Sequence, residues 1–323
     1  MDYLLLIVGL GLLLLAANYL VDSSVAIAQR AKISNFIIGL TIVGIGTSSP
    51  ELFVSVSSAL SDSGDIAMGN VLGSNIANIF LILGITAIIL PFSIERLQRV
   101  RDIPFLVIMS LLVMVIANDA ILPGLKNELS RLDGIFLLLV FICYLAWVVV
   151  QKGKDPKKAI EEADEEAKSS LTGKNPWLLW GIAILSLALL IYGGNLFLDS
   201  AKNLARAWGM SEAVIAITIV AVGTSLPELV TAIVAASKKN PQLVLGNVIG
   251  SNLFNLMFIL GTASVVKPLA FNGINAVDYV VMLVAAIMLY LVIYTFKKNR
   301  LDRIEGIIFL AAYVGYTVYL LLR

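Results

Sequence analysis

Long apolar segments alternate with short polar connections along almost the whole chain. Windows of about 20 apolar residues, the length that crosses a bilayer as a helix, predict ten membrane spans. They lie near residues 3–28, 35–60, 67–90, 103–118, 133–150, 177–204, 212–236, 244–266, 277–296 and 304–322. The only hydrophilic stretch of any size runs from 151 to 175. The pattern therefore predicts an all-α membrane protein with a charged connector near its middle.

The sequence repeats itself with an offset of 177 residues. Residues 46–52, GTSSPEL, return as residues 223–229, GTSLPEL. Residues 69–78, GNVLGSNIAN, return at the same offset as residues 246–255, GNVIGSNLFN. Because no gap is needed between the two motifs, the duplicated unit is much larger than either motif. Each half then holds five of the predicted spans.

An odd number of spans in each half determines how the halves are related. A five-span unit followed by its copy enters the membrane from the opposite face the second time, so the halves are predicted to be inverted repeats. We expect residues 1–150 to form the first five-helix repeat, residues 151–175 a cytoplasmic linker, and residues 176–323 the second, inverted repeat. The connections after the odd-numbered spans hold 17 of the 23 Lys and Arg residues. The positive-inside rule therefore places those connections in the cytoplasm and both termini outside.

Composition narrows the possible chemistry. With 59% hydrophobic residues, 14% charged residues and a mean hydropathy of +0.94, the chain differs from an ordinary soluble domain. It has no histidine, and Cys143 is its only cysteine. These absences exclude a disulfide within the chain, imidazole or thiolate metal sites and Ser-His catalysis. With no Walker sequence either, we expect no enzyme activity, no cofactor and no nucleic-acid partner.

Each copy of the first motif places a glutamate inside an apolar segment. An ionisable side chain deep in a bilayer costs at least ~2.5–3.5 kcal/mol and by default indicates an ion or substrate pathway. Pro50 and Pro227 remove a backbone donor in mid-span, so each helix should break there and free carbonyl oxygens for ligation. Glu51 and Glu228 are therefore the leading candidate ion ligands. The alternative is that both are helix-end charges in water, with the spans drawn wrongly.

Oxygen-bearing side chains accompany both glutamates. A threonine lies four residues before each glutamate, and in each following span a serine and an asparagine repeat this spacing, so the members of each pair share a helix face. The side chains expected to gather at mid-membrane, between the two repeats, are Thr47, Ser48, Glu51, Ser74, Asn78, Thr224, Ser225, Glu228, Ser251 and Asn255. An all-oxygen set with two carboxylates suits calcium, and a smaller subset suits sodium.

Other repeated residues are better explained by packing. The glycines Gly69, Gly73, Gly246 and Gly250 have the small-xxx-small spacing of closely packed membrane helices. Four asparagines, Asn70, Asn75, Asn247 and Asn252, are expected to cap or bridge helices. Asp22 and Asp199 occupy equivalent positions, where interfacial anchoring or a gate near Lys202 is the expected role.

Together the paired motifs resemble the alpha-repeats of the sodium/calcium exchanger superfamily, in particular its compact prokaryotic branch. The resemblance covers nearly the whole chain and implies ten helices, an outside N-terminus, and a calcium site flanked by sodium sites at mid-membrane. It implies that the hydroxyl residues above complete the sites around these ligands: Glu51, Glu228, Asn78, Asn255, and the backbone carbonyls of Gly44 and Ala221. Several relatives carry Asp where this chain has Asn255, which argues against potassium co-transport.

The sequence thus predicts an antiporter that exchanges calcium for sodium across the cytoplasmic membrane, with the long first and sixth spans sliding to switch access. Two glutamates balance one divalent cation, and mutual exclusion at shared ligands would produce exchange. Calcium/proton exchange, in which the glutamates titrate, and a passive cation channel are the alternatives. The expected partners are calcium, sodium and the lipid bilayer; a monomer is sufficient, and the sequence does not predict the oligomeric state.

Overall fold

The computed structural model describes the chain except for residues 118–126, 152–168, 211–222, 272, 296–297 and 323. The described part is mostly helical. In the first half the helices are α1 (Asp2–Ala31), α2 (Asn35–Ile38), the π-helix η1 (Gly39–Val43), α3 (Gly44–Thr47), α4 (Ser49–Leu60), α5 (Gly64–Ile76), the π-helix η2 (Ala77–Leu83), α6 (Gly84–Ile89), the π-helix η3 (Gln98–Asp102), α7 (Ile103–Ile116) and α8 (Arg131–Gln151). In the second half they are α10 (Pro176–Ala207), α13 (Leu226–Ser237), α14 (Pro241–Leu253), the π-helix η7 (Phe254–Ile259), α15 (Leu260–Val266), α16 (Ala276–Leu291) and α17 (Arg303–Leu322).

Six helices of the described chain are long and apolar enough to cross a membrane, or seven if one bent pair counts as a single span. The six are α1, the run from α5 to α6, α8, α10, the run from α14 to α15, and α17. The span expected at 103–118 falls on α7, which has 14 residues, and that at 277–296 falls on α16, which has 16 residues. The first part of the span expected at 212–236 lies outside the described residues, and α13 covers its end.

The predicted break in the second span is confirmed. The segments Asn35–Thr47 and Ser49–Leu60 meet at an angle of 45°, with Ser48 between them at φ −83°, ψ 11°. Pro50 is the second residue of α4, where a missing N–H breaks no helical hydrogen bond. Ser225 has almost the same geometry before α13, at φ −88°, ψ 11°, and Pro227 is again the second helical residue.

The two halves share local structure as well as sequence. Adding 177 to the bounds of α4 and α5 gives those of α13 and α14, and the π-helices η2 and η7 begin at equivalent residues, Ala77 and Phe254. Segments with the i→i+5 pattern are uncommon and frequent at functional sites. Both begin inside the second motif, two residues after its Ser-Asn pair.

Helix α14 packs against the backbone of α2 and η1. A Cβ on Gly250 would clash with the carbonyl oxygen of Leu40, and one on Gly246 would clash with that of Phe36. Close packing was therefore predicted correctly for this pair. The prediction of close packing was wrong for Gly73. A Cβ added to this residue would meet nothing within 4 Å, because α5 borders a cavity of about 180 Å³ there.

Two short antiparallel ladders join the halves. Strand β1 (Phe92–Ser93) pairs with β4 (Arg300–Leu301), so that Phe92 lies opposite Leu301. Strand β2 (Glu128–Leu129) pairs with β3 (Leu269–Ala270), so that Glu128 lies opposite Ala270. Each ladder takes one strand from each half, which ties the second half to the first.

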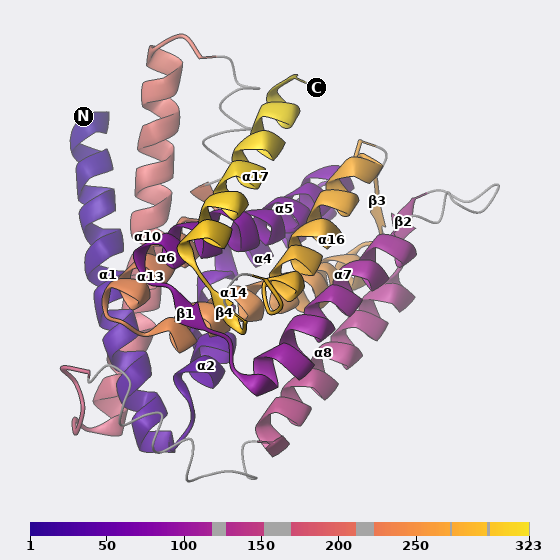
Figure 1. Cartoon of the computed structure of the whole chain (residues 1–323). Helices are drawn as coiled ribbons and strands as arrows, with labels where there is room; N and C mark the ends of the chain where they lie inside the picture. The colour runs from indigo at the N-terminus through magenta and orange to yellow at the C-terminus, as the bar shows by residue number, and fades with distance from the viewer. Residues whose placement is uncertain (118–126, 152–168, 211–222, 272, 296–297, 323) are drawn as a thin grey trace.

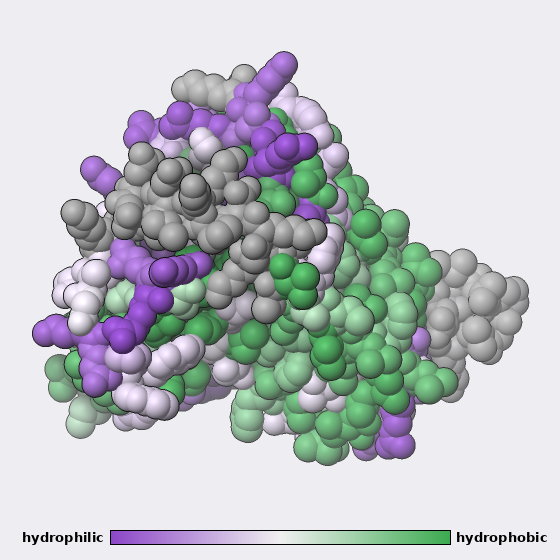
Figure 2. All heavy atoms as spheres, turned by 90° about the horizontal axis from the view of Figure 1, so that it is seen from below, coloured by the Kyte–Doolittle hydropathy of each residue, from purple (hydrophilic) through white to green (hydrophobic). Residues whose placement is uncertain are grey.

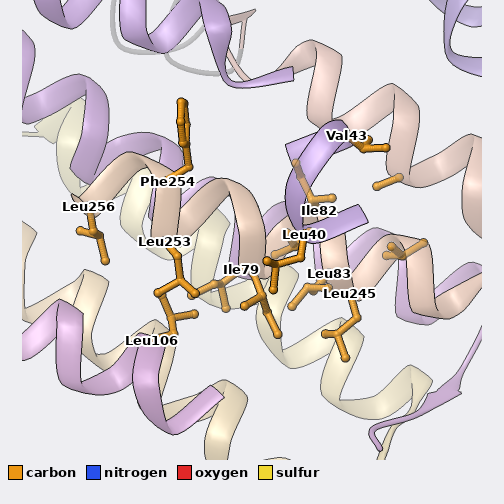
Figure 3. Packing of buried hydrophobic residues seen from close by; sticks show 14 of the residues in the cluster. Leu40, Val43, Ile79, Ile82, Leu83, Leu106, Leu245, Leu253, Phe254 and Leu256 are labelled. Carbon is orange, nitrogen blue, oxygen red and sulfur yellow. The ribbon is translucent and has the colours of Figure 1, made fainter. Parts of the chain in front are cut away.

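The hydrophobic core surrounds the π-helical segments. Figure 3 shows Ile79 and Ile82 of η2 close to Leu40 of η1, with Leu245 and Leu253 of α14 nearby. These residues are at most 3% exposed. The polar motifs are therefore held in a closely packed interior rather than on a surface.

The outside of the molecule is largely apolar. Helices α1 and α10 lie side by side along one edge, and the ends of α1 and α17 nearest the chain termini point to the same end of the molecule (Figure 1). Hydrophobic side chains cover a broad flank, while hydrophilic ones gather elsewhere on the face seen in Figure 2. On α8, Leu132 and Val150 are 78% and 68% exposed. An apolar flank of this kind fits contact with lipid.

Candidate cation site

The two glutamates of the first motif are both buried, at 1% exposure each. Glu51 lies in the first turn of α4 and Glu228 in the first turn of α13. At these positions the free N–H groups and the helix dipole favour negative charge. The two carboxylates are close enough to interact electrostatically. The fold therefore brings together two carboxylates that are 177 residues apart in the sequence.

Glu228 is held by the opposite half of the molecule. The Ser48 hydroxyl donates a hydrogen bond of 2.9 Å to Glu228 Oε1. The second carboxylate oxygen, Oε2, is buried and has no hydrogen-bond partner in the described chain. A free carboxylate oxygen thus points into the protein interior.

Glu51 is the equivalent carboxylate of the first half, and neither of its oxygens has a hydrogen-bond partner among the residues the structure describes. Ser225, the repeat equivalent of Ser48, also has a buried, unpartnered hydroxyl within that set. No ion pair of the described residues includes either glutamate. Leaving buried carboxylates uncompensated is costly, which fits a site built for cations.

The backbone of the broken second span is also engaged. Ser251 donates a hydrogen bond of 3.2 Å to the carbonyl oxygen of Gly44. The Thr47 hydroxyl lies 3.4 Å from the same carbonyl and 3.4 Å from Asn247 Oδ1. Thr47, Ser48 and Ser251 are all fully buried. These contacts place Gly44, Thr47 and Ser251 in one polar cluster across the two halves.

The two asparagines that end the second motif lie in the π-helices. Asn78 in η2 donates a hydrogen bond of 3.0 Å to Asn252 of α14, and its own Oδ1 is buried without a partner in the described chain. Asn255 in η7 is 1% exposed, and neither end of its amide has a hydrogen-bond partner there. Ser74 is buried, and its hydroxyl has no hydrogen-bond partner among the described residues.

One predicted ligand, Thr224, lies beside a cavity. Thr224 is half-buried and lines a cavity of about 350 Å³ between α4, α10 and the second copy of the first motif. Asn195, Asp199 and Lys202 of α10 line the same cavity. Ala221 lies outside the described residues. The cavity leads to the second copy of the first motif from the C-terminal half of α10.

Asp22 on α1, the repeat equivalent of Asp199, is held by neighbouring side chains. Lys238 at the end of α13 lies 2.7 Å from Asp22 Oδ1, and Ser170 donates a hydrogen bond of 2.9 Å to Asp22 Oδ2. Asp199, by contrast, is exposed and pairs at 3.2 Å with Lys202 on its own helix. The two repeat-related positions therefore have opposite environments.

Sequence reasoning missed some polar residues around the site. Thr231 lies three residues after Glu228 on α13 and has a buried hydroxyl with no partner among the described residues. The spacing was visible in the sequence, but the equivalent residue is Val54, so the repeat drew no attention to it. The bridging role expected for asparagines is confirmed for Asn70, which donates to Ser55 at 3.1 Å, and for Asn252.

These features define a multi-pass membrane protein with two buried carboxylates and several unpaired oxygens near the contact of its halves. The family model described as sodium/calcium exchanger protein matches residues 1–150 and 178–322. The chain belongs to the sodium/calcium exchanger family. It is similar in particular to proteins of the compact prokaryotic branch.

Two relatives match almost the whole chain. The protein named putative antiporter CaxA, from Alkalimonas amylolytica, is 36% identical over 96% of this chain and 95% of its own length. The sodium/calcium exchanger MaX1 from Methanosarcina acetivorans is 32% identical over 99% of this chain and 98% of its own.

A solved structure gives the same picture. The sodium-calcium exchanger NCX_Mj, soaked with 2.5 mM Na⁺ and 0.1 mM Ca²⁺, matches with a TM-score of 0.82 and 32% identity. The match covers 98% of this chain and 97% of that one. Family and structure together support a cation/calcium antiporter, and the family comprises exchangers rather than enzymes.

Proposed function

We propose that this protein is a secondary active antiporter that exchanges calcium for sodium across the cytoplasmic membrane by alternating access. The observation that carries the proposal is the pair Glu51 and Glu228, buried and interacting across the two halves with no cationic side chain paired to either in the described chain. Two carboxylates balance one calcium ion. When calcium leaves, the same oxygens need monovalent cations, so the two ions compete.

The ligands are the oxygen atoms grouped around this pair. In the proposal calcium contacts both glutamates and sodium occupies flanking positions. The proposed ligand residues are Gly44, Thr47, Ser48, Glu51, Ser74, Asn78, Ala221, Thr224, Ser225, Glu228, Ser251 and Asn255. Hard oxygen ligands without imidazole or thiolate favour calcium and sodium over transition metals.

The proposed architecture is ten helices in two inverted repeats, residues 1–150 and 176–323, joined by the linker 151–175. It is supported by the shared bounds of α4 with α13 and of α5 with α14. The distribution of Lys and Arg supports a cytoplasmic linker and outside termini. The common direction of the two chain ends in Figure 1 agrees with an even number of spans.

Alternating access is supported by the difference between the two repeat-related entrances. The cavity beside Thr224, Asp199 and Lys202 opens one route to the site. On the other route Val25 and Thr47, the equivalents of Lys202 and Thr224, are at most 2% exposed. With the linker in the cytoplasm, the structure corresponds to an outward-facing state. In the proposal, sliding of α1 and α10 exchanges the two environments.

Calcium-45 uptake into proteoliposomes tests the function. Vesicles are loaded with sodium or with potassium, at equal pH on both sides and with a protonophore present. Uptake only into sodium-loaded vesicles is the expected result, and it excludes a simple channel. Equal uptake in both would overturn sodium exchange.

Calcium/proton exchange is the second candidate. The observation that favours it is that Glu51 Oε1 and Oε2 and Glu228 Oε2 have no partner in the described chain, so protons could replace calcium there. Repeating the uptake with an imposed pH gradient, in the absence of sodium and protonophore, distinguishes proton exchange from passive leak.

A further inference from the structure

We infer that Asn252 is a positioning residue that turns the Asn78 amide so that its carbonyl oxygen faces the transported ion; this rests on the proposed function. Asn252 was not among the expected ligands. It lies in α14, whereas Asn78 lies in η2 of the other half. The inference starts from the hydrogen bond of 3.0 Å that joins their side chains.

The polarity of this hydrogen bond is informative. An asparagine amide has a donor end and an acceptor end of similar size, and only the acceptor end can bind a cation. In Asn78 the donor end is used by Asn252 Oδ1, while the acceptor end, Oδ1, is buried with no partner in the described part of the chain. An unmet buried oxygen costs about 1–3 kcal/mol, and a cation would meet it.

Without an acceptor at position 252, no hydrogen bond among the described residues would fix the direction of the Asn78 amide. The two side chains are at most 1% exposed, so bulk water does not take over this role. The Asn252 carbonyl also adds negative potential at the Asn78 amide, which makes its oxygen a stronger ligand. Partners of this kind typically contribute 10- to 100-fold to metal affinity.

The repeat supplies the equivalent pair of asparagines, between which no hydrogen bond is formed in the described chain. Asn75 and Asn255 are the equivalents of Asn252 and Asn78. Asn75 donates a hydrogen bond of 2.7 Å to Val71 O, which leaves its buried Oδ1 as the free acceptor. Helix α5, which carries Asn75, packs against η7, which carries Asn255. Asn75 is therefore suited to orient Asn255 in the same way when an ion binds there.

The test measures calcium-45 uptake kinetics of full-length variants in proteoliposomes. Asn252→Leu removes the acceptor at similar volume. It should raise the KM for calcium about tenfold or more, while the maximal rate stays within about threefold because binding rather than turnover is weakened. Asn252→Asp keeps an acceptor oxygen and adds a negative charge near the ion, so its KM for calcium should be no higher than that of the wild type. An unchanged KM in Asn252→Leu, or an equal defect in Asn252→Asp, would overturn the inference.

A double mutant separates positioning from general damage. If Asn252 acts through Asn78, then Asn252→Leu in an Asn78→Leu background should change the KM by less than about twofold further, since coupled residues are not additive. A full additional loss in that background would contradict the inference. Thr86→Val is the matched control, because Thr86 is buried and bonds only within its own helical run. It should leave the KM unchanged.

Glu51→Gln distinguishes failure of this inference from failure of the proposed function. Loss of uptake in Glu51→Gln with normal kinetics in Asn252→Leu would reject the positioning role alone. Normal uptake in Glu51→Gln would reject the proposed site itself, and the positioning role with it.

Discussion

Lys238 at the end of α13 forms an ion pair of 2.7 Å with Asp22 on α1. Its ammonium group also donates to the carbonyl oxygen of Asn18, and the Ser169 hydroxyl donates to the carbonyl oxygen of Asp22. The end of the linker, α1 and α13 are therefore joined at one place. The repeat equivalent of Lys238 is Ser61, so the same ion pair cannot form at the opposite entrance.

This asymmetry predicts that the ion pair favours the outward-facing state. Replacing Lys238 by Met should raise the population of inward-facing molecules about five- to thirtyfold, the effect of losing about 1–2 kcal/mol from a partly buried pair. The measurement is the rate at which a polar thiol reagent labels Val25→Cys from the cytoplasmic side, in a chain whose Cys143 is replaced. Lys202→Met is the control, because Lys202 pairs within its own helix. Equal labelling in Lys238→Met and the parent would contradict this role.

The glycines of the second motif predict a sharp difference between the two halves. Gly250→Ala should destabilise the protein by about 1–3 kcal/mol, because overpacking forces backbone shifts and the new Cβ would meet the Leu40 carbonyl. Gly73→Ala, at the equivalent position, has open space and should be neutral or stabilising by up to about 1 kcal/mol. Thermal unfolding of the purified variants, monitored by size-exclusion chromatography, measures both changes in stability. Similar melting of the two variants would contradict the packing described for α14.

Asn255 predicts how charge sets ion preference. Asn255→Asp adds a third carboxylate to a site that has two, and opposite charges a few ångströms apart gain up to about 4 kcal/mol at an effective dielectric constant near 20. We expect the KM for calcium to fall at least tenfold. The KM for sodium should fall less, because an added negative charge attracts a divalent ion more strongly than a monovalent one. Uptake kinetics at several calcium and sodium concentrations measure this. A higher KM for calcium would show that Asn255 does not face the ion.

The parts of the fold that follow from local chemistry were predictable from the sequence. A proline in the middle of a span predicts a break in the helix. The break beside Pro50 is found at Ser48. The offset of 177 residues likewise predicted which segments of the two halves share local structure. The π-helical turns were not predicted, because the apolar pattern of η2 and η7 reads as ordinary helix. The i→i+5 pattern depends on the packing of the whole segment.

The parts that depend on distant partners could not be predicted. Gly73 and Gly250 have the same local sequence, but only α14 packs against another backbone at this position. Interfacial anchoring or a gate near Lys202 was the role expected for Asp22, but its partner Lys238, 216 residues away, was not predicted. Sequence identified the glutamates because a charge in an apolar segment is itself unusual, whereas a lysine at a helix end is not.

Calcium binding to the purified protein tests the central claim most directly. Isothermal titration calorimetry compares the wild type, Glu51→Gln and Glu228→Gln, each with and without sodium. We predict that the wild type binds calcium and that sodium weakens this binding. Either Gln variant should bind calcium at least tenfold more weakly, because contacts to an ionised carboxylate are stronger than contacts to a neutral amide. Calcium binding by either variant as tight as that of the wild type would contradict the claim that these two glutamates hold the transported ion.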